Sequence, residues 1–164
     1  MKKAFTMIEL IFVIVILGIL SSVAISKMSV TRDDAQIAKG RSQISAIRNA
    51  ITLMRNTNML QGKGASYPSK LDALSTATSA DGDAIFDYDS NSSDSSKKLL
   101  DYPIYAKNSN GNWRKTANNT YAFRVVNTDI SFSYTATGTN AGQFDCNHND
   151  TDANKKKYCK ALTE

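Results

Sequence analysis

The stretch KKAFTMIELIFVIVILGIL, residues 2–20, combines two lysines, a long aliphatic run and a single carboxylate, Glu9. A helix over residues 5–25 is roughly 31 Å long at about 1.5 Å per residue, which matches a hydrocarbon core of about 30 Å. Lys2 and Lys3 precede the apolar run, so the positive-inside rule keeps the N-terminus in the cytoplasm. The sequence therefore predicts a membrane-spanning helix, with the rest of the chain exported.

Two simpler interpretations of this segment stay open. A secretory signal peptide also begins with basic residues, but its apolar part is usually only about 7–15 residues long. The stretch SSVAIS, residues 21–26, offers small residues for such a cleavage. A plain single-span anchor explains the length and the lysines but leaves Glu9 unexplained, because a charge within the membrane is costly and needs a partner.

The same segment resembles the N-terminus of type IV pilins and of the pseudopilins of type II secretion and DNA-uptake systems. The resemblance is close over about residues 2–30 and only architectural beyond. It implies that a prepilin peptidase removes the leader, residues 1–4, by cutting between Ala4 and Phe5, and that Phe5 is then N-methylated. Glu9 corresponds to the glutamate that these proteins carry four residues after the new N-terminus. The family usually has Gly before the cut, where this chain has Ala4.

Electrostatics gives Glu9 a role that fits the resemblance. Cleavage before Phe5 creates a positive amine, and the Glu9 carboxylate of one subunit can meet that amine on a neighbouring subunit. Two unit charges about 4 Å apart attract by about 4 kcal/mol at an effective dielectric near 20, whereas one of them buried alone is costly. The pairing favours assembly into a helical filament. The alternative is that Glu9 merely extends to the lipid headgroups.

Helical periodicity continues beyond the membrane segment, over residues 27–60. The apolar stripe favours one helix lying on a sheet over a coiled coil, because only about four heptads are present and Gly40 weakens one of the positions. The helix is expected to end between residues 58 and 62, where Gly62 acts as terminator. Four basic residues are assigned to the face opposite the stripe. The stripe consists of Val30, Ile37, Ile44, Ile47, Ile51 and Met54, and the basic residues are Lys39, Arg41, Arg48 and Arg55.

The remaining residues, 61–164, are predicted to form a globular head. Apolar residues alternate in the stretches TYAFRVV and DISFSYTATG, which predicts a hairpin joined by residues 127–129. Shorter strands are expected at residues 102–106 and 142–146, and a polar loop at residues 75–98. The predicted class is α+β, with the second half of the long helix packed on a small antiparallel sheet.

Two cysteines, Cys146 and Cys159, would meet an oxidising compartment after export, so we expect a disulfide between them. The resemblance implies the same kind of C-terminal loop. A zinc site that adds His148 is the alternative, but it has only three candidate ligands and unsuitable spacing.

The resemblance also suggests a calcium site, because some pseudopilins bind calcium in the head. The stretch DYDSNSSD, residues 87–94, places Asp87, Asp89 and Asn91 at alternate positions, as an EF-hand loop begins. The match then fails, because Ser92 stands where Gly is required and Lys98 where Glu is required. The interpretation is a solvated loop without a cofactor, and an irregular calcium site stays an alternative.

Charge is uneven along the chain. Residues 27–63 hold seven Lys or Arg against two Asp, a net of +5, whereas residues 64–164 hold eleven against twelve, a net of −1. Anionic lipid headgroups or subunit contacts explain the basic helix. The stretches WRK and NKKKY pair aromatic with basic residues, which suggests a direct contact with DNA as an alternative.

Three hypotheses follow, none of them enzymatic, because one His and no phosphate-binding loop leave little for catalysis. The first is a structural subunit of a type IV pilus or pseudopilus, held in the inner membrane with its head in the periplasm. The resemblance implies other pilin subunits, a prepilin peptidase that also methylates, and an assembly platform with a cytoplasmic ATPase as its partners. The second is a DNA-uptake pseudopilin that contacts DNA, and the third is an anchored periplasmic domain that does not polymerise. The sequence does not separate pilus from pseudopilus, or major from minor subunit.

Overall fold

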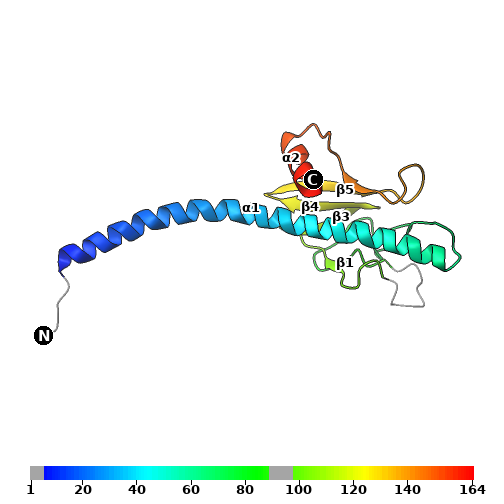
Figure 1. The fold of residues 1–164 in the computed structure, drawn as a ribbon, viewed down its shortest axis with the longest axis horizontal. Coiled ribbons are helices and arrows are strands. Elements are labelled where there is room, and N and C mark those ends of the chain that lie inside the picture. Colours follow the sequence, from blue (N-terminus) through cyan, green and yellow to red (C-terminus); the bar gives the residue numbers. More distant parts are fainter. Residues whose placement is uncertain (1–5, 89–97) are drawn as a thin grey trace. The chain divides into compact units, whose positions relative to one another are not determined.

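The computed structural model describes residues 6–88 and 98–164, and within the first helix it describes the backbone but not the side chains of residues 24–31. The chain divides into two compact units, Met1–Ala35 and Gln36–Glu164. The elements, in chain order, are α1 (Met7–Leu60), β1 (Ala84–Ile85), β2 (Ile104–Tyr105), β3 (Trp113–Ala117), β4 (Thr120–Val125), β5 (Thr128–Tyr134), β6 (Phe144–Cys146) and α2 (Ala153–Thr163) (Figure 1).

The first unit consists of the N-terminal part of α1, whose apolar side chains are exposed to solvent. From Met7 to Val23 the large aliphatic and aromatic side chains are between 40% and 81% exposed. Within the part of the chain that the structure describes, no helical segment combines the length and the apolarity needed to cross a membrane.

In the second unit, the stripe predicted for the C-terminal part of α1 is confirmed from Ile37 to Met54; the side chain of Val30 lies outside the described residues. Ile44, Ile47 and Ile51 are almost completely buried, Met54 is 7% exposed, and Ile37 packs at the edge of the same core. The helix ends in a Schellman motif, in which Lys63 N donates to Asn58 O and Gly62 N donates to Met59 O. Gly62 adopts a φ of 73°, the left-handed conformation that such a cap requires.

The main sheet is antiparallel, with the strand order β3-β4-β5-β6. Tyr121 on β4 pairs with Phe132 on β5, and Phe132 pairs with Cys146 on β6. The predicted hairpin of β4 and β5 is confirmed, but its turn is Val126–Asn127, because Val125 pairs directly with Thr128. Both turn residues have positive φ, as a two-residue hairpin turn of this hand requires.

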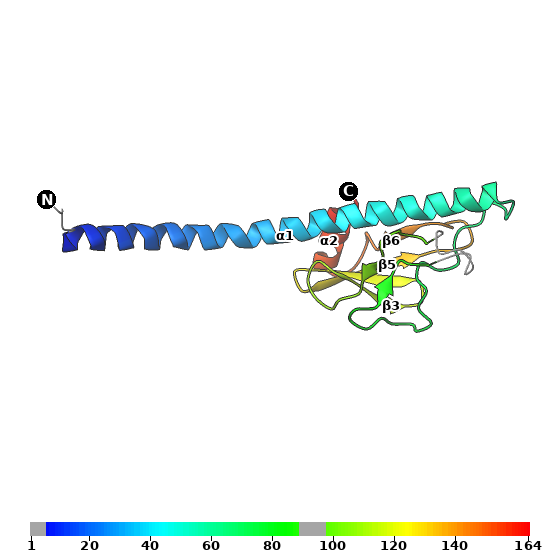
Figure 2. The ribbon, with the colours of Figure 1, turned by 90° about the horizontal axis from the view of Figure 1, so that it is seen from below.

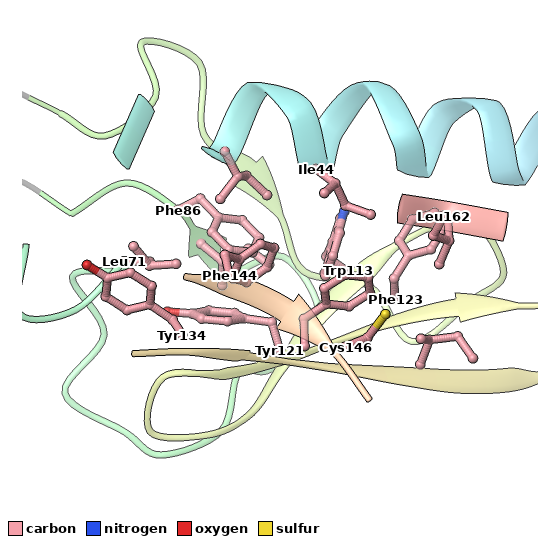
Figure 3. Packing of buried hydrophobic residues seen from close by; sticks show 14 of the residues in the cluster. Ile44, Leu71, Phe86, Trp113, Tyr121, Phe123, Tyr134, Phe144, Cys146 and Leu162 are labelled. Atoms are coloured by element: carbon pink, nitrogen blue, oxygen red, sulfur yellow. The ribbon is translucent and has the colours of Figure 1, made fainter. Parts of the chain in front are cut away.

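The core of the second unit lies between the sheet and α1, and aromatic side chains form its centre. Trp113 is fully buried, and its ring centroid lies 5.0 Å from that of Phe123 and 5.2 Å from that of Phe132. Figure 3 shows Ile44 of α1 above Trp113, and Leu162 of α2 beside Phe123. A second view shows the part of α1 after residue 36 running along the sheet (Figure 2). The predicted α+β class is confirmed.

Two segments differ from the sequence-based prediction. Residues 75–98 were expected to form a polar loop, but β1 lies in this segment, pairs with β2, and is followed by the fully buried Phe86. The stretch WRK was read as a surface for DNA, but it opens β3 and faces the core at alternate positions. In both cases the strand is short and mixes polar with apolar residues, so the alternation of apolar residues was too weak to predict a strand.

The C-terminal disulfide between Cys146 and Cys159 is confirmed, with Cα atoms 5.9 Å apart. The segment it closes is not simply a loop, because Cys159 lies within α2 and is buried. Asp152 caps this helix by accepting from the backbone N–H groups of Asn154 and Lys155. An Asp directly before ANKKKYCKAL was the sequence signal for a helix start that the loop interpretation missed.

Candidate assembly segment

The N-terminus of α1 is organised around Thr6 and Glu9. Thr6 precedes the first helical residue, and Glu9 N lies 3.2 Å from Thr6 O and 3.4 Å from Thr6 Oγ1. The sequence Thr6-Met7-Ile8-Glu9 is that of a capping box. The positive end of the helix dipole also stabilises an acid at the third helical position. The structure shows the Thr6 side of this arrangement, and the capping role of the Glu9 carboxylate follows from the sequence motif.

Glu9 is exposed and stands among exposed apolar side chains in the first unit. Its neighbours in sequence, Ile8 and Leu10, are 73% and 57% exposed. Ala4 and Phe5, the predicted cleavage and methylation residues, lie outside the described residues. The described segment thus offers a carboxylate on an apolar helix that nothing covers within its own unit.

The sequence placed the basic residues of α1 opposite the stripe, but three of them contact other elements of the second unit. Arg48 donates to Phe144 O over 3.0 Å and to Asp145 Oδ1 over 3.1 Å. Arg41 donates to Ala161 O, and Lys39 Nζ lies 3.1 Å from Asn112 Oδ1. These side chains flank the packed stripe and attach α1 to β6, to α2 and to the loop before β3.

The predicted DNA contact through WRK is wrong for two of its three residues. Trp113 is fully buried, and its indole N–H donates to Gln43 Oε1 over 3.1 Å. Lys115 is 4% exposed and forms an ion pair with Asp72. Neither side chain can stack on a base or contact a phosphate, because neither reaches the surface.

Arg114, the third residue of WRK, forms a partly exposed triad with Arg124 and Asp129. Asp129 accepts from Arg114 Nη2 and, over 2.9 Å, from Arg124 Nε. Partial burial acts to raise the pKa of Asp129, but the hydrogen bonds from the two guanidinium groups outweigh it and hold the pKa below its usual value. The triad joins β3, β4 and β5 on the face of the sheet opposite the core.

Several residues of the two candidate metal sites use their ligand atoms in bonds within the protein. The sulfur atoms of Cys146 and Cys159 lie within 4.8 Å of His148, but they are joined in the disulfide and are not free thiolates. Of the calcium candidates, Asp87 accepts from Ala73 N over 3.0 Å. Asp89 and Asn91 lie outside the described residues.

Comparison with known proteins adds one finding at the N-terminus. Residues 1–25 match the sequence profile of the prokaryotic N-terminal methylation motif, which is the signature of type IV pilins and pseudopilins. The motif indicates a structural protein of the pilin or pseudopilin type, implies processing by a prepilin peptidase and assembly with other pilins, and suggests anchoring in the inner membrane. No curated protein and no solved structure matches the chain significantly.

Proposed function

We propose that this protein is a structural subunit of a type IV pilus or pseudopilus filament. The peptidase cuts between Ala4 and Phe5, Phe5 is methylated, and the chain is stored in the inner membrane with its N-terminus in the cytoplasm and its head in the periplasm. An assembly platform with its ATPase then extracts the subunit into the filament. In this scheme residues 5–26 form the assembly segment, residues 27–60 the helix that carries the head, and residues 61–164 the head.

The observation that carries the proposal is the methylation motif on a helix whose apolar side chains are exposed. Exposed apolar area of this extent is unfavourable in water and marks a surface that binds lipid or protein. Lipid covers the segment before assembly, and the same segments of neighbouring subunits cover it afterwards. The second unit, Gln36–Glu164, which joins the head to the C-terminal part of α1, has its own buried core, so it does not need the filament to fold.

Glu9 is the residue whose role the experiment must resolve, because pairing and capping both explain it. Pairing requires the negative charge, whereas a capping box accepts Gln at the same position. Glu9→Gln therefore keeps the helix start and removes the charge, and Glu9→Ala removes both. We expect filament yield to collapse in both variants, with Glu9→Gln no better than Glu9→Ala.

The readout is filament yield by electron microscopy, at matched membrane levels of the subunit. Wild-type yield from Glu9→Gln together with loss in Glu9→Ala would assign Glu9 to capping and refute the pairing. Normal filament yield from both variants would also refute the pairing. A subunit that stays anchored in the membrane and enters no filament, the wild type included, would favour an anchored domain that does not polymerise.

Mass spectrometry of the native N-terminus tests processing separately. The expected mature chain begins at Phe5 and carries one methyl group on its amine. Ala4→Gly restores the residue that the family usually has before the cut and should speed cleavage. A native chain that retains Met1 would contradict the proposal.

Direct binding of DNA stays a prediction for the exposed lysines at residues 155–157 at the start of α2. Phosphate contacts weaken steeply with salt, so the purified protein should bind DNA more tightly at low than at high ionic strength. Binding that is absent or insensitive to salt would remove this possibility.

A further inference from the structure

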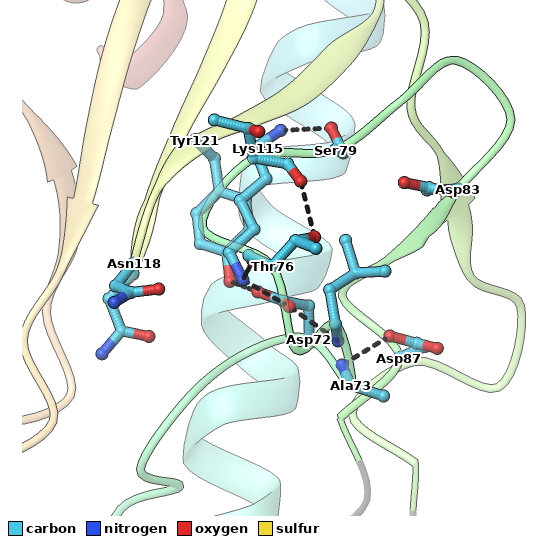
Figure 4. Close-up of polar contacts among 12 residues, drawn as sticks. Asp72, Ala73, Thr76, Ser79, Asp83, Asp87, Lys115, Asn118 and Tyr121 are labelled. Carbon is cyan, nitrogen blue, oxygen red and sulfur yellow. Dashed lines mark hydrogen bonds and ion pairs between the residues drawn. The ribbon is translucent and has the colours of Figure 1, made fainter.

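A lysine, an aspartate and a tyrosine are buried together beneath the sheet (Figure 4). Asp72 and Tyr121 are inaccessible to solvent, and Lys115 is 4% exposed. Lys115 Nζ lies 2.9 Å from Asp72 Oδ1 and 2.8 Å from Thr76 O. Tyr121 donates its hydroxyl proton to Asp72 Oδ2 in a short hydrogen bond, and Leu74 N donates to Asp72 Oδ1 over 2.9 Å.

The surroundings of this cluster disfavour separated charges. The ring of Tyr121 lies against Phe86, with centroids 4.5 Å apart, and both residues are fully buried. An ion pair in such a site pays a large desolvation penalty. Transfer of one proton from the ammonium to the carboxylate removes both charges and leaves an amine nitrogen in contact with a carboxylic acid.

We propose that Lys115 and Asp72 join in an intramolecular isopeptide bond. The lone pair of Nζ attacks Cγ of Asp72, so a carbon–nitrogen bond forms. The bond between Cγ and Oδ2 then breaks, and Oδ2 leaves as water. The ammonium and the carboxylate together supply every atom of the amide and of the water, with no oxidant or activating group required.

Tyr121 is placed to assist the departure of Oδ2, because its hydroxyl group already donates to that oxygen. It gives its proton to the leaving oxygen and regains one from the nitrogen as the amide forms. Burial, and then the hydrogen bond to Asp72, raise the pKa of the Tyr121 phenol, so the hydroxyl group is protonated and holds its hydrogen bond to Oδ2.

The hydrogen bonds on the other side of the cluster suit the product. Oδ1 becomes the amide oxygen and keeps the hydrogen bond from Leu74 N. The one proton left on Nζ points to Thr76 O, which already accepts from this nitrogen. The bond would tie β3 to the segment before β1, across 43 residues of sequence. It does not depend on the filament role.

The mass of the intact wild-type protein decides the proposal by itself. The purified full-length chain in detergent, denatured before ionisation, should weigh one water less than its sequence, after allowance for the disulfide and for N-terminal processing. A tryptic digest should contain the peptides of Asp72 and Lys115 as one branched species. A wild-type chain at its full sequence mass, with both peptides separate, would overturn the proposal.

Matched variants locate the bond. Lys115→Arg keeps a cation beside Asp72 but has no nucleophilic amine, so it should restore the full mass, whereas Lys107→Arg at an exposed position should leave the deficit. Asp72→Asn should lose ammonia instead of water and reach the same final mass as the wild type. Tyr121→Phe should slow conversion in chains refolded from inclusion bodies that still have the full sequence mass, and conversion at the wild-type rate would refute the part given to Tyr121.

Discussion

Replacing Gly40 by alanine should destabilise the second unit, although alanine is the better helix former. Gly40 is buried in α1 where α2 and β4 approach the helix. A Cβ atom at this position would lie 2.5 Å from Leu162 Cδ2 and 2.7 Å from Phe123 Cε1. Carbon atoms in contact normally stay about 3.5–4.0 Å apart, so both side chains would have to move by about 1 Å.

The magnitude is a difference between two effects of opposite sign. Alanine gains about 1 kcal/mol over glycine in a helix interior. Overpacking a tight core costs about 1–3 kcal/mol, and the upper part of that range applies because Leu162 and Phe123 are themselves buried, with little room to shift. We expect a net loss of about 1–2 kcal/mol in the free energy of unfolding.

Urea unfolding followed by the fluorescence of Trp113 measures this loss, because Trp113 is the chain's single tryptophan and is fully buried. Ser45→Ala on the exposed face of the same helix is the control, and it should be neutral or slightly stabilising. The cost of Gly40→Ala should shrink when Leu162→Ala is already present, since that change makes room. Gly40→Ala at wild-type stability or above would refute the close packing of α1 against α2 and β4.

Three further changes have outcomes of known direction. Replacing both Cys146 and Cys159 by alanine should lower the free energy of unfolding by about 3 kcal/mol by loop-closure entropy, and reductant should then have no additional effect on the urea midpoint. Asp152→Ala should lower the free energy of unfolding by about 1 kcal/mol, because it removes the N-cap of α2. Asp152→Asn should retain most of that stability, since Asn also caps helices, and equal losses of the two variants in thermal unfolding would argue against capping. The pKa of Asp129 is lower in the folded state than in the unfolded state, where it is about 3.9. Asp129 therefore stabilises the fold fully at pH values above about 3.9, and this stabilisation is lost as the pH falls through the lower folded pKa. The gap in urea midpoint between wild type and Asp129→Asn should therefore be present at neutral pH and close at acidic pH; a gap that widens in acid would contradict the pairing with Arg124.

Local patterns predicted much of the fold, because the features concerned repeat within a few residues. The spacing of Ile44, Ile47 and Ile51 identified the packed face of α1, and alternation in TYAFRVV and DISFSY identified β4 and β5. The two cysteines had only each other as partners. The methylation motif at residues 1–25 is likewise a linear signal, and it carries most of the functional interpretation.

What failed were assignments that required knowing which distant segment lies opposite a residue. In the sequence, Gly40 interrupts an apolar helical stripe, yet in the structure α2 and β4 approach α1 closely at this residue. Trp113 reads as a surface aromatic beside basic residues, yet it is the centre of the core. The basic residues of α1 were assigned to the face opposite the stripe, yet Arg48 binds Asp145 of β6.

The sequence by itself determined the character of the N-terminal segment, since charge order, apolar length and a capping box act within one stretch of chain. It also determined the helix stripe and the central hairpin, whose periods follow from backbone geometry. Only the tertiary structure decided which polar groups go inside, because burial is a property of contacts between remote segments. Lys115 and Asp72 look like ordinary surface residues in the sequence, and folding placed them against each other where water cannot reach.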